Sequence, residues 1–251
     1  MAANDTAAAI KAALRASADP ERAVHDRQYL KSSTPHWGVP VPAARAAVRT
    51  AAPTLARDEL LAVVDLLWGR GVHDTRLAAA ILLDRECAAM QPVDLPQLET
   101  MIREAGTWAL VDVLVPRPVA AIDDADTMAT TAALDRWCSD ENLWLRRSAL
   151  LSHLVPFRAD WGNWERFTRY ADSLLEDRQF FVRKAMGWVL REASRSRPEV
   201  VAEWLVTRTD RISGVALREA VKPLEPADRE GLLAAYRAGR PGGAAARPAP
   251  R

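Results

Sequence analysis

The chain has 251 residues, and its hydrophobic fraction of 49% and charged fraction of 27% are those of an ordinary soluble globular protein. Its 34 lysines and arginines against 33 aspartates and glutamates leave a net charge of +1, so no charge excess points to a nucleic-acid or membrane partner. Two cysteines exclude a disulfide scaffold and a multi-cysteine zinc site, and no apolar run approaches the roughly 18 residues of a membrane span. The N-terminal segment is charged throughout and lacks the apolar core of a signal peptide, which predicts a cytoplasmic protein.

Helical spacing dominates from the N-terminus onward, and strand signals are nearly absent. Residues 1–55 are predicted to form a helical cap that contains the Pro-rich turn PHWGVPVP at 35–42. Beyond it, apolar residues recur at three- and four-residue steps in segments of about 11–16 residues, separated by Pro, Gly and polar caps. The tail at 237–251 is rich in Gly, Pro, Ala and Arg and is predicted to be disordered. The fold class predicted is all-α.

The helices predicted over 56–236 fall into two alternating sets. One set begins near Asp74, Trp108, Asn142, Phe180 and Ser213, at steps of 34, 34, 38 and 33 residues. The other set occupies 58–69, 94–105, 126–138, 163–175 and 198–207. Paired helices with a period of about 35–45 residues are typical of an α-solenoid of HEAT-like helical pairs. We therefore expect one continuous domain, cap included, whose concave face is lined by the helix that begins at Trp108 and its equivalents.

Basic residues concentrate on two of the helices expected to line the concave face, 142–156 and 180–195. Their only acidic residue is Glu192, and their basic residues are Arg146, Arg147, Arg183, Lys184, Arg191 and Arg195. A concave basic groove suits a polyanion. The alternative is ordinary HEAT packing, in which such arginines bond to acidic residues of their own repeat.

Trp108 and Asp112 are four residues apart and therefore share one face of their helix. Alignment of the equivalent helices by their small residue puts Trp188 at the position of Asp112, two repeats later. A carboxylate in a basic groove would repel phosphate, so its position beside indoles favours a cationic target. The alternatives are core packing for the tryptophans and, for Asp112, a salt bridge to an arginine of a neighbouring repeat.

Other chemistry finds no support. The sequence has no His-x-x-x-His or Cys-x-x-Cys spacing and no glycine-rich phosphate loop, so we expect neither a metal site nor a cofactor. Cys87 lies in an apolar helical segment and is expected in the core rather than as a nucleophile.

Several segments resemble one family. The strings TWALVDVL, NLWLRRSALL, FFVRKAMGWVLREAS and SGVALREAVKPL, with the N-terminal YLKSSTPHWGVPVPAAR, are similar to the DNA alkylation repair family of HEAT-like-repeat DNA glycosylases, the AlkD type. The resemblance covers residues 25–225. It implies that Trp108, Asp112 and Trp188 are the catalytic residues. The chain departs from the family in being Arg-rich and near neutral, and in lacking a second aromatic and an acid inside the Trp-x3-Asp motif.

The resemblance also implies a set of DNA-binding residues. Arg147 and Arg191 would grip the DNA backbone, and Arg195 occupies a position that is usually basic. To these we add the neighbouring basic residues of the same helices and two residues of the N-terminal motif, namely Arg146, Arg183, Lys184, Tyr29 and Lys31.

The activity implied is that of a monofunctional DNA glycosylase. It would hydrolyse the N-glycosidic bond of positively charged N3- or N7-alkylated purines in double-stranded DNA and leave an abasic site, without a base-flipping pocket. Asp112 would stabilise the cationic sugar and orient water, and the two indoles would cradle the sugar. No lysine lies near Asp112, which favours hydrolysis without lyase chemistry. We expect a monomer, cytoplasmic and nucleoid-associated when bound to DNA; the alternative is a non-catalytic HEAT-repeat module that binds damaged DNA or a protein partner.

Overall fold

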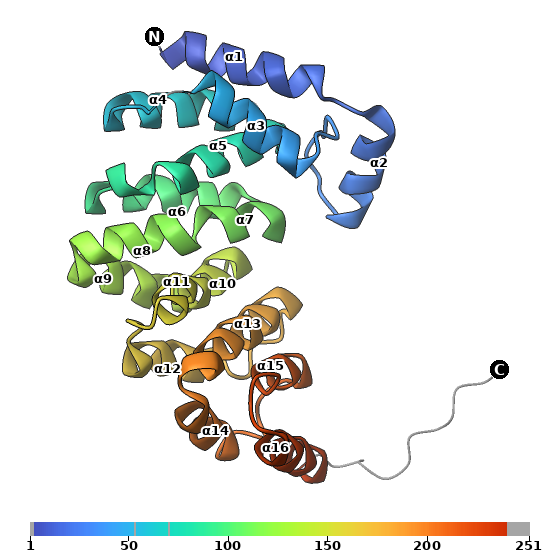
Figure 1. The fold of residues 1–251 in the computed structure, drawn as a ribbon, viewed down its shortest axis with the longest axis vertical. Helices are drawn as coiled ribbons and strands as arrows, with labels where there is room; N and C mark the ends of the chain where they lie inside the picture. Colours follow the sequence, from blue (N-terminus) through green and yellow to red (C-terminus); the bar gives the residue numbers. More distant parts are fainter. Residues whose placement is uncertain (1–2, 53, 70, 240–251) are drawn as a thin grey trace, which may run out of the picture. The chain divides into compact units, whose positions relative to one another are not determined.

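The protein was analysed as a computed structural model that describes residues 3–52, 54–69 and 71–239 (Figure 1). Within these residues every regular element is a helix, which confirms the all-α prediction. The chain divides into a first unit, Met1–Ser152, and a second unit, His153–Arg251. Because these are two separate units, the continuous stack expected over 56–236 stays a prediction. Residues 240–251 of the expected tail lie outside the described residues.

The first unit begins with α1 (Ala3–Ala16), α2 (Pro20–Tyr29) and α3 (Val41–Ala51). The Pro-rich turn between α2 and α3 is fastened to the next helices by Asp74, whose carboxylate accepts the N–H groups of Trp37 at 2.6 Å and Val39 at 2.8 Å. Gly38 between them has φ +76°, and a Cβ there would lie 2.1 Å from the carbonyl oxygen of Asp19. Only glycine fits this close approach of the turn to α2.

The rest of the first unit is a series of helices that pack on near neighbours in the sequence. These are α4 (Arg57–Trp68), α5 (His73–Arg85), η1 (Cys87–Ala89), η2 (Pro92–Asp94), α6 (Leu95–Glu104), α7 (Trp108–Leu114), α8 (Pro116–Ala125), α9 (Thr127–Cys138) and α10 (Leu143–Leu151). In this series α5 packs on α4 and α7, and α10 packs on α6, α7 and α9. The expected helices 58–69, 94–105 and 126–138 agree with α4, α6 and α9 to within one residue at each end.

Two tryptophans of the first unit belong to its core. Trp68 and Trp137 are buried, and each indole Nε1–H donates at 2.8 Å to a glutamate of α6, Glu104 and Glu99 respectively. Cys87 is also buried, as expected for a core residue. Core packing therefore accounts for these residues, and the chemistry has to be sought elsewhere in the unit.

The second unit consists of α11 (Leu154–Arg158), α12 (Trp164–Ser173), α13 (Phe180–Ser196), α14 (Pro198–Val206), α15 (Gly214–Ala220) and α16 (Pro226–Ala238). The prediction of one helix over 142–156 is wrong, because α10 ends at Leu151 and α11 starts at Leu154. Pro156 explains the break, since its ring clashes with the carbonyl four residues earlier, at Ser152.

The long helix α13 is the centre of the second unit and packs on α11, α14 and α15. Its approach to α15 depends on Gly187, where a Cβ would lie 2.8 Å from the Cα of Ala216. Ser194 reinforces the contact by donating its hydroxyl to the carbonyl of Ala220 at 2.9 Å. This tight packing fixes the directions in which the remaining side chains of α13 can point.

Candidate active site

Helix α7 presents Trp108 and Asp112 on its outer side. Thr107 caps the helix by accepting the N–H of Ala109 at 3.3 Å, so Trp108 is the first helical residue and Asp112 follows one turn later. The residues on the opposite side, Leu110, Val111 and Leu114, are buried in the core. The side chain of Asp112 keeps 18% of its surface exposed. The carboxylate is therefore reachable from solvent while its backbone is held rigidly.

A buried arginine holds the Asp112 carboxylate from behind. Arg147, on the neighbouring helix α10, donates its Nε–H to Oδ1 at 2.9 Å and its Nη2–H groups to Oδ1 at 2.7 Å and Oδ2 at 2.9 Å. Only 2% of the Arg147 side chain is exposed, and burial of a charge at this depth requires a partner of opposite charge. This burial argues against the expected contact of Arg147 with a DNA phosphate. It agrees instead with the alternative in which Asp112 bonds to an arginine of a neighbouring repeat.

Aromatic side chains border the ion pair on its accessible side. Trp108 is partly exposed, and the ring of Tyr29, from α2, meets it edge-on with centroids 6.1 Å apart and planes at 82°. Tyr29 is 66% exposed, and His25 stacks on its other side at 6.2 Å. We refer to Tyr29, Trp108, Asp112 and Arg147 as the α7 cluster. It joins an acid, its basic partner and two aromatic rings from three helices.

The other basic residues predicted in the first unit lie outside the α7 cluster. Arg146 donates its Nη1–H groups to the carbonyls of Asp140 at 2.6 Å and Glu141 at 2.8 Å, which ties it to the turn before α10. Lys31, just after α2, is exposed with φ 50°. Neither residue contacts the Asp112 carboxylate.

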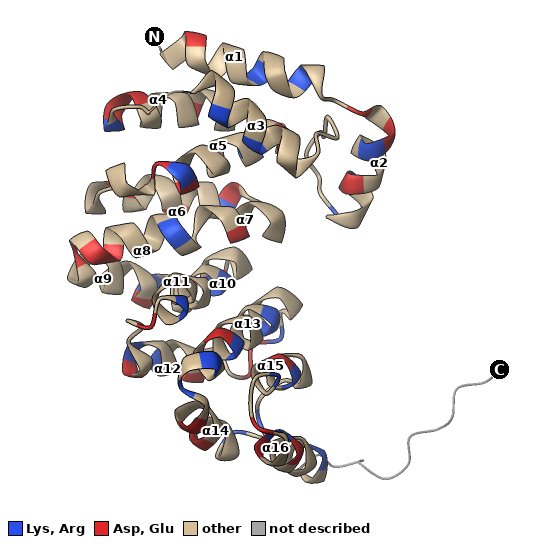
Figure 2. Ribbon diagram, in the orientation of Figure 1, with Lys and Arg blue, Asp and Glu red and all other residues tan. Residues whose placement is uncertain are grey.

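Helix α13 carries the predicted residues of the second unit, and several of its arginines have acidic partners. Arg191 bonds to Glu219 of α15 at 2.5 Å, and Arg195 bonds to Glu192 at 2.7 Å. Figure 2 shows basic and acidic segments together on this helix. Glu192, the lone acid expected among these bases, is buried and also bonds to Arg158 at 3.5 Å. These pairs follow the HEAT-packing alternative.

The remaining predicted residues of α13 are less engaged. Arg183 donates its Nε–H to the carbonyl of Asp177 at 2.5 Å. Lys184 is exposed and forms no ion pair within the described residues. Trp188 is partly exposed, so it is not a pure core residue. Because Trp188 belongs to the second unit and the α7 cluster to the first, the two are described separately.

A family model described as DNA alkylation repair enzyme matches residues 10–224 of the chain. The chain belongs to the DNA alkylation repair family. A solved structure described as a predicted DNA alkylation repair enzyme from Enterococcus faecalis is similar in fold, with a TM-score of 0.72 and 20% identity, over 84% of this chain and 98% of that chain. No curated protein matches the chain.

For this member of the DNA alkylation repair family, sequence reasoning missed the direct contact between Arg147 and Asp112. The two residues are 35 positions apart, which is one repeat of the helical pattern. Residues one repeat apart lie on successive stacked elements, so this spacing was a signal for their pairing. The Tyr29–Trp108 contact had no comparable signal, because the cap does not share the repeat.

Two further observations concern what the described part of the chain contains. No group of three or more His, Cys, Asp or Glu side chains in it could hold a metal ion. None of its helices is both long and apolar enough to cross a membrane.

Proposed function

We propose that this member of the DNA alkylation repair family is a monofunctional DNA glycosylase. It would hydrolyse the N-glycosidic bond of N3- or N7-alkylated purines in duplex DNA and leave an abasic site. The observation that carries the proposal is the Asp112 carboxylate, which is held in place by Arg147 and remains accessible one helical turn from Trp108.

An alkylated purine is positively charged and leaves readily, because it departs neutral with the electrons of the broken bond. The enzyme therefore has to stabilise the positive charge that develops on the sugar, and a fixed carboxylate beside C1′ does so. Water then adds to C1′, with Asp112 as the acceptor that orients it, and the surplus proton passes to solvent. No acid is required to protonate the leaving group.

Arg147 is a positioning residue in this proposal. Its charge offsets part of the field of Asp112, but the two charges differ in depth, with Arg147 buried and Asp112 accessible. The pair therefore presents its negative end to a ligand. Three N–H···O contacts keep the carboxylate oriented, so little reorganisation is needed when the sugar becomes cationic.

The DNA would be held by aromatic and basic side chains around this carboxylate. Trp108 and Tyr29 offer ring surfaces to the deoxyribose, and we propose that Trp188 joins them when DNA is bound. A HEAT-like stack of both units, with a basic concave face, would provide the surface for the backbone. On it, the exposed Lys31 and Lys184 are the simplest phosphate contacts.

The decisive experiment measures the release of free base from duplex DNA that contains N7-methylguanine. We expect the wild-type protein to release the base, and Asp112→Asn to slow release by about 100-fold or more, because the amide keeps the shape and loses the charge. Binding to undamaged DNA should change little.

Asp140→Asn is the matched control. Asp140 has the same 18% side-chain exposure as Asp112 and also binds an arginine, Arg103, through two contacts, but it lies outside the α7 cluster. Release should be unaffected in this variant. Equal release by Asp112→Asn and wild type would contradict the role of Asp112. Absence of release by the wild type from methylated and bulkier N3 and N7 adducts alike would contradict the activity itself.

A second candidate function is a non-catalytic module that binds damaged DNA or a protein partner. The observation that favours it is the Asp112–Arg147 ion pair itself, since a carboxylate with a buried arginine partner also has a purely structural explanation. The partial exposure of Trp108 and Trp188 favours the glycosylase, because a structural role would bury them. A gel-shift on the same DNA identifies a protein that binds without releasing base.

A further inference from the structure

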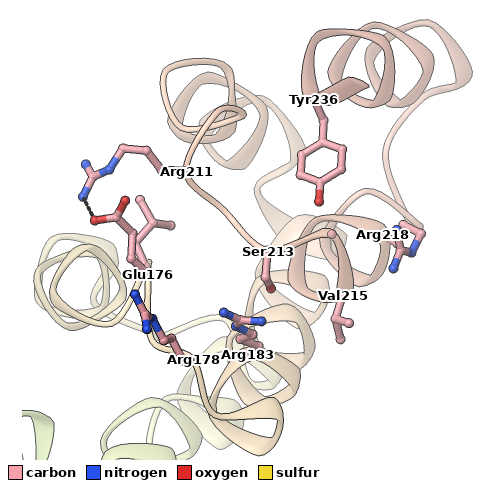
Figure 3. A pocket seen from close by; sticks show the side chains of 10 residues that line it. Glu176, Arg178, Arg183, Arg211, Ser213, Val215, Arg218 and Tyr236 are labelled. Carbon is pink, nitrogen blue, oxygen red and sulfur yellow. Dashed lines mark hydrogen bonds and ion pairs between the residues drawn. The ribbon is translucent and has the colours of Figure 1, made fainter. Parts of the chain in front are cut away.

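A polar cavity of about 480 Å³ lies within the second unit, away from the α7 cluster (Figure 3). It opens between the turn before α13, the start of α15 and the helix α16. We call it the arginine pocket and define it by six of its lining residues: Arg178, Arg183, Arg211, Ser213, Arg218 and Tyr236. Its volume is within the range of small-ligand sites.

The arginine pocket holds four guanidinium groups and a single carboxylate, that of Glu176. Glu176 bonds to Arg211 at 3.3 Å, at the edge of the cavity (Figure 3). Arg178 and Arg218 are exposed and form no ion pair within the described residues. Arg183 uses its Nε–H for the carbonyl of Asp177, and neither of its terminal nitrogens has a partner in the described part of the chain. The cavity therefore has a strong positive excess.

Neutral polar groups complete the lining. Ser213 accepts the N–H of Ala216 at 3.2 Å, and its own O–H can still donate. In Figure 3 the hydroxyl of Tyr236 points toward the start of α15. Gly214 makes room there, since a Cβ would lie 2.6 Å from the Tyr236 hydroxyl and 2.8 Å from Nη1 of Arg218. Any other residue at position 214 would push both polar groups away from the backbone.

We propose that the arginine pocket binds a phosphate group, and that the DNA backbone supplies it. Guanidinium groups bind phosphate through paired N–H···O contacts, and hydroxyls add further donors. Like charges gathered in one cavity repel each other, and a bound anion removes that repulsion. Except for Arg183, the residues of the pocket are outside the DNA-binding set expected from the sequence. The site is independent of catalysis at Asp112, so it stands or falls separately from the glycosylase.

The test uses the full-length protein and undamaged duplex DNA, so that base excision cannot influence the result. The double variant Arg178→Ala/Arg218→Ala removes two exposed pocket charges. The matched control, Arg229→Ala/Arg237→Ala, removes two positive charges from α16 that do not line the pocket. DNA affinity is measured by fluorescence anisotropy at several salt concentrations, and circular dichroism checks that each variant is folded.

We expect the pocket variant to bind DNA about 10-fold more weakly and to lower the slope of log affinity against log salt by about 1, the value for one phosphate contact. The control should leave the slope unchanged. The single variant Arg178→Gln, at an exposed position, should show the same trend to a smaller extent. Equal changes in slope for the pocket and control variants would overturn the proposal.

A second measurement identifies the source of the phosphate. Inorganic phosphate should raise the thermal unfolding midpoint of the wild type relative to chloride at equal ionic strength, and it should not do so for the pocket variant. If phosphate stabilises only the wild type but the DNA slope does not change, DNA is overturned as the source and a small phosphate-bearing molecule replaces it. If phosphate has no effect and the slope does not change, the site itself is refuted.

Discussion

Arg147 in the first unit and Arg191 in the second were expected to do the same work, yet their surroundings differ. Each bonds to a carboxylate on a neighbouring helix, Arg147 to Asp112 and Arg191 to Glu219. Arg147 is 2% exposed, whereas Arg191 and Glu219 are each 28% exposed. The same residue type in corresponding repeats can thus serve as an internal support or as a surface group, and the depth of the side chain decides which.

The contrast extends to the rest of each unit. The first unit buries other ionisable groups, including Asp94 bonded to Arg57 and the stacked pair His36 and His73. The second unit leaves arginines around an open cavity with too few acids to neutralise them. Charge in the first unit therefore contributes mainly to stability and to the orientation of Asp112, while charge in the second unit is available to a ligand.

The largest expected effect comes from removal of the buried arginine. Arg147→Met should lower the free energy of unfolding by about 3–5 kcal/mol, because it leaves the Asp112 carboxylate without its buried partner. Chemical denaturation measures the loss. The double variant Asp112→Asn/Arg147→Met should recover part of it, since it leaves no uncompensated charge.

Arg103→Met is the matched control for that change. Arg103 also binds a carboxylate through two contacts, with Asp140, but its side chain is 40% exposed. Its replacement should cost less than about 1 kcal/mol. Equal losses for Arg147→Met and Arg103→Met would mean that burial does not separate the two kinds of arginine.

An intermediate effect is expected from acid, through the histidine pair of the first unit. Burial, and next the proximity of His36, lower the pKa of His73 to about 4 from an ordinary 6.5. The two rings stack with centroids 4.3 Å apart. The unfolded chain therefore takes up a proton near pH 6.5, whereas the folded chain takes it up only near pH 4. Stability is present in full above pH 6.5 and falls by up to about 3 kcal/mol as the pH drops to about 4.

Denaturation of His73→Phe between pH 7 and about pH 4 checks this expectation, because the variant lacks the group that titrates. Its stability should depend less on pH than that of the wild type. His25→Gln, which changes a histidine whose side chain is 76% exposed, should follow the wild-type curve. An acid dependence that is the same in all three proteins would remove His73 as its cause.

The smallest effect on stability is expected at Arg191. Arg191→Gln should change the free energy of unfolding by less than about 1 kcal/mol, because the pair is accessible to water. Glu219 also keeps a second partner, as Lys222, and next Arg191, hold its pKa below the ordinary value. If Arg191 contacts DNA, the same variant should lower the salt slope of DNA binding by about 1. A large loss of stability with unchanged DNA binding would make Arg191 resemble Arg147 and cancel the contrast.

The candidate site was only partly predictable. Trp108 and Asp112 could be placed on one face because a helix has a fixed periodicity, and α7 starts at Trp108 as expected. The contact of Tyr29 with Trp108 could not be foreseen, because it joins residues 79 positions apart through the path of the Pro-rich turn. The arginine pocket was missed for the same reason, since its residues come from three separate segments between 175 and 236.

The sequence by itself determined the elements of this protein. Its apolar spacing, capping residues and prolines produce helices at the expected positions, since these signals act between residues a few positions apart. Only the tertiary structure decided how deep each charged side chain lies and which partner it meets. Those properties depend on contacts between distant segments, and they turned Arg147 from an expected DNA contact into the support of Asp112.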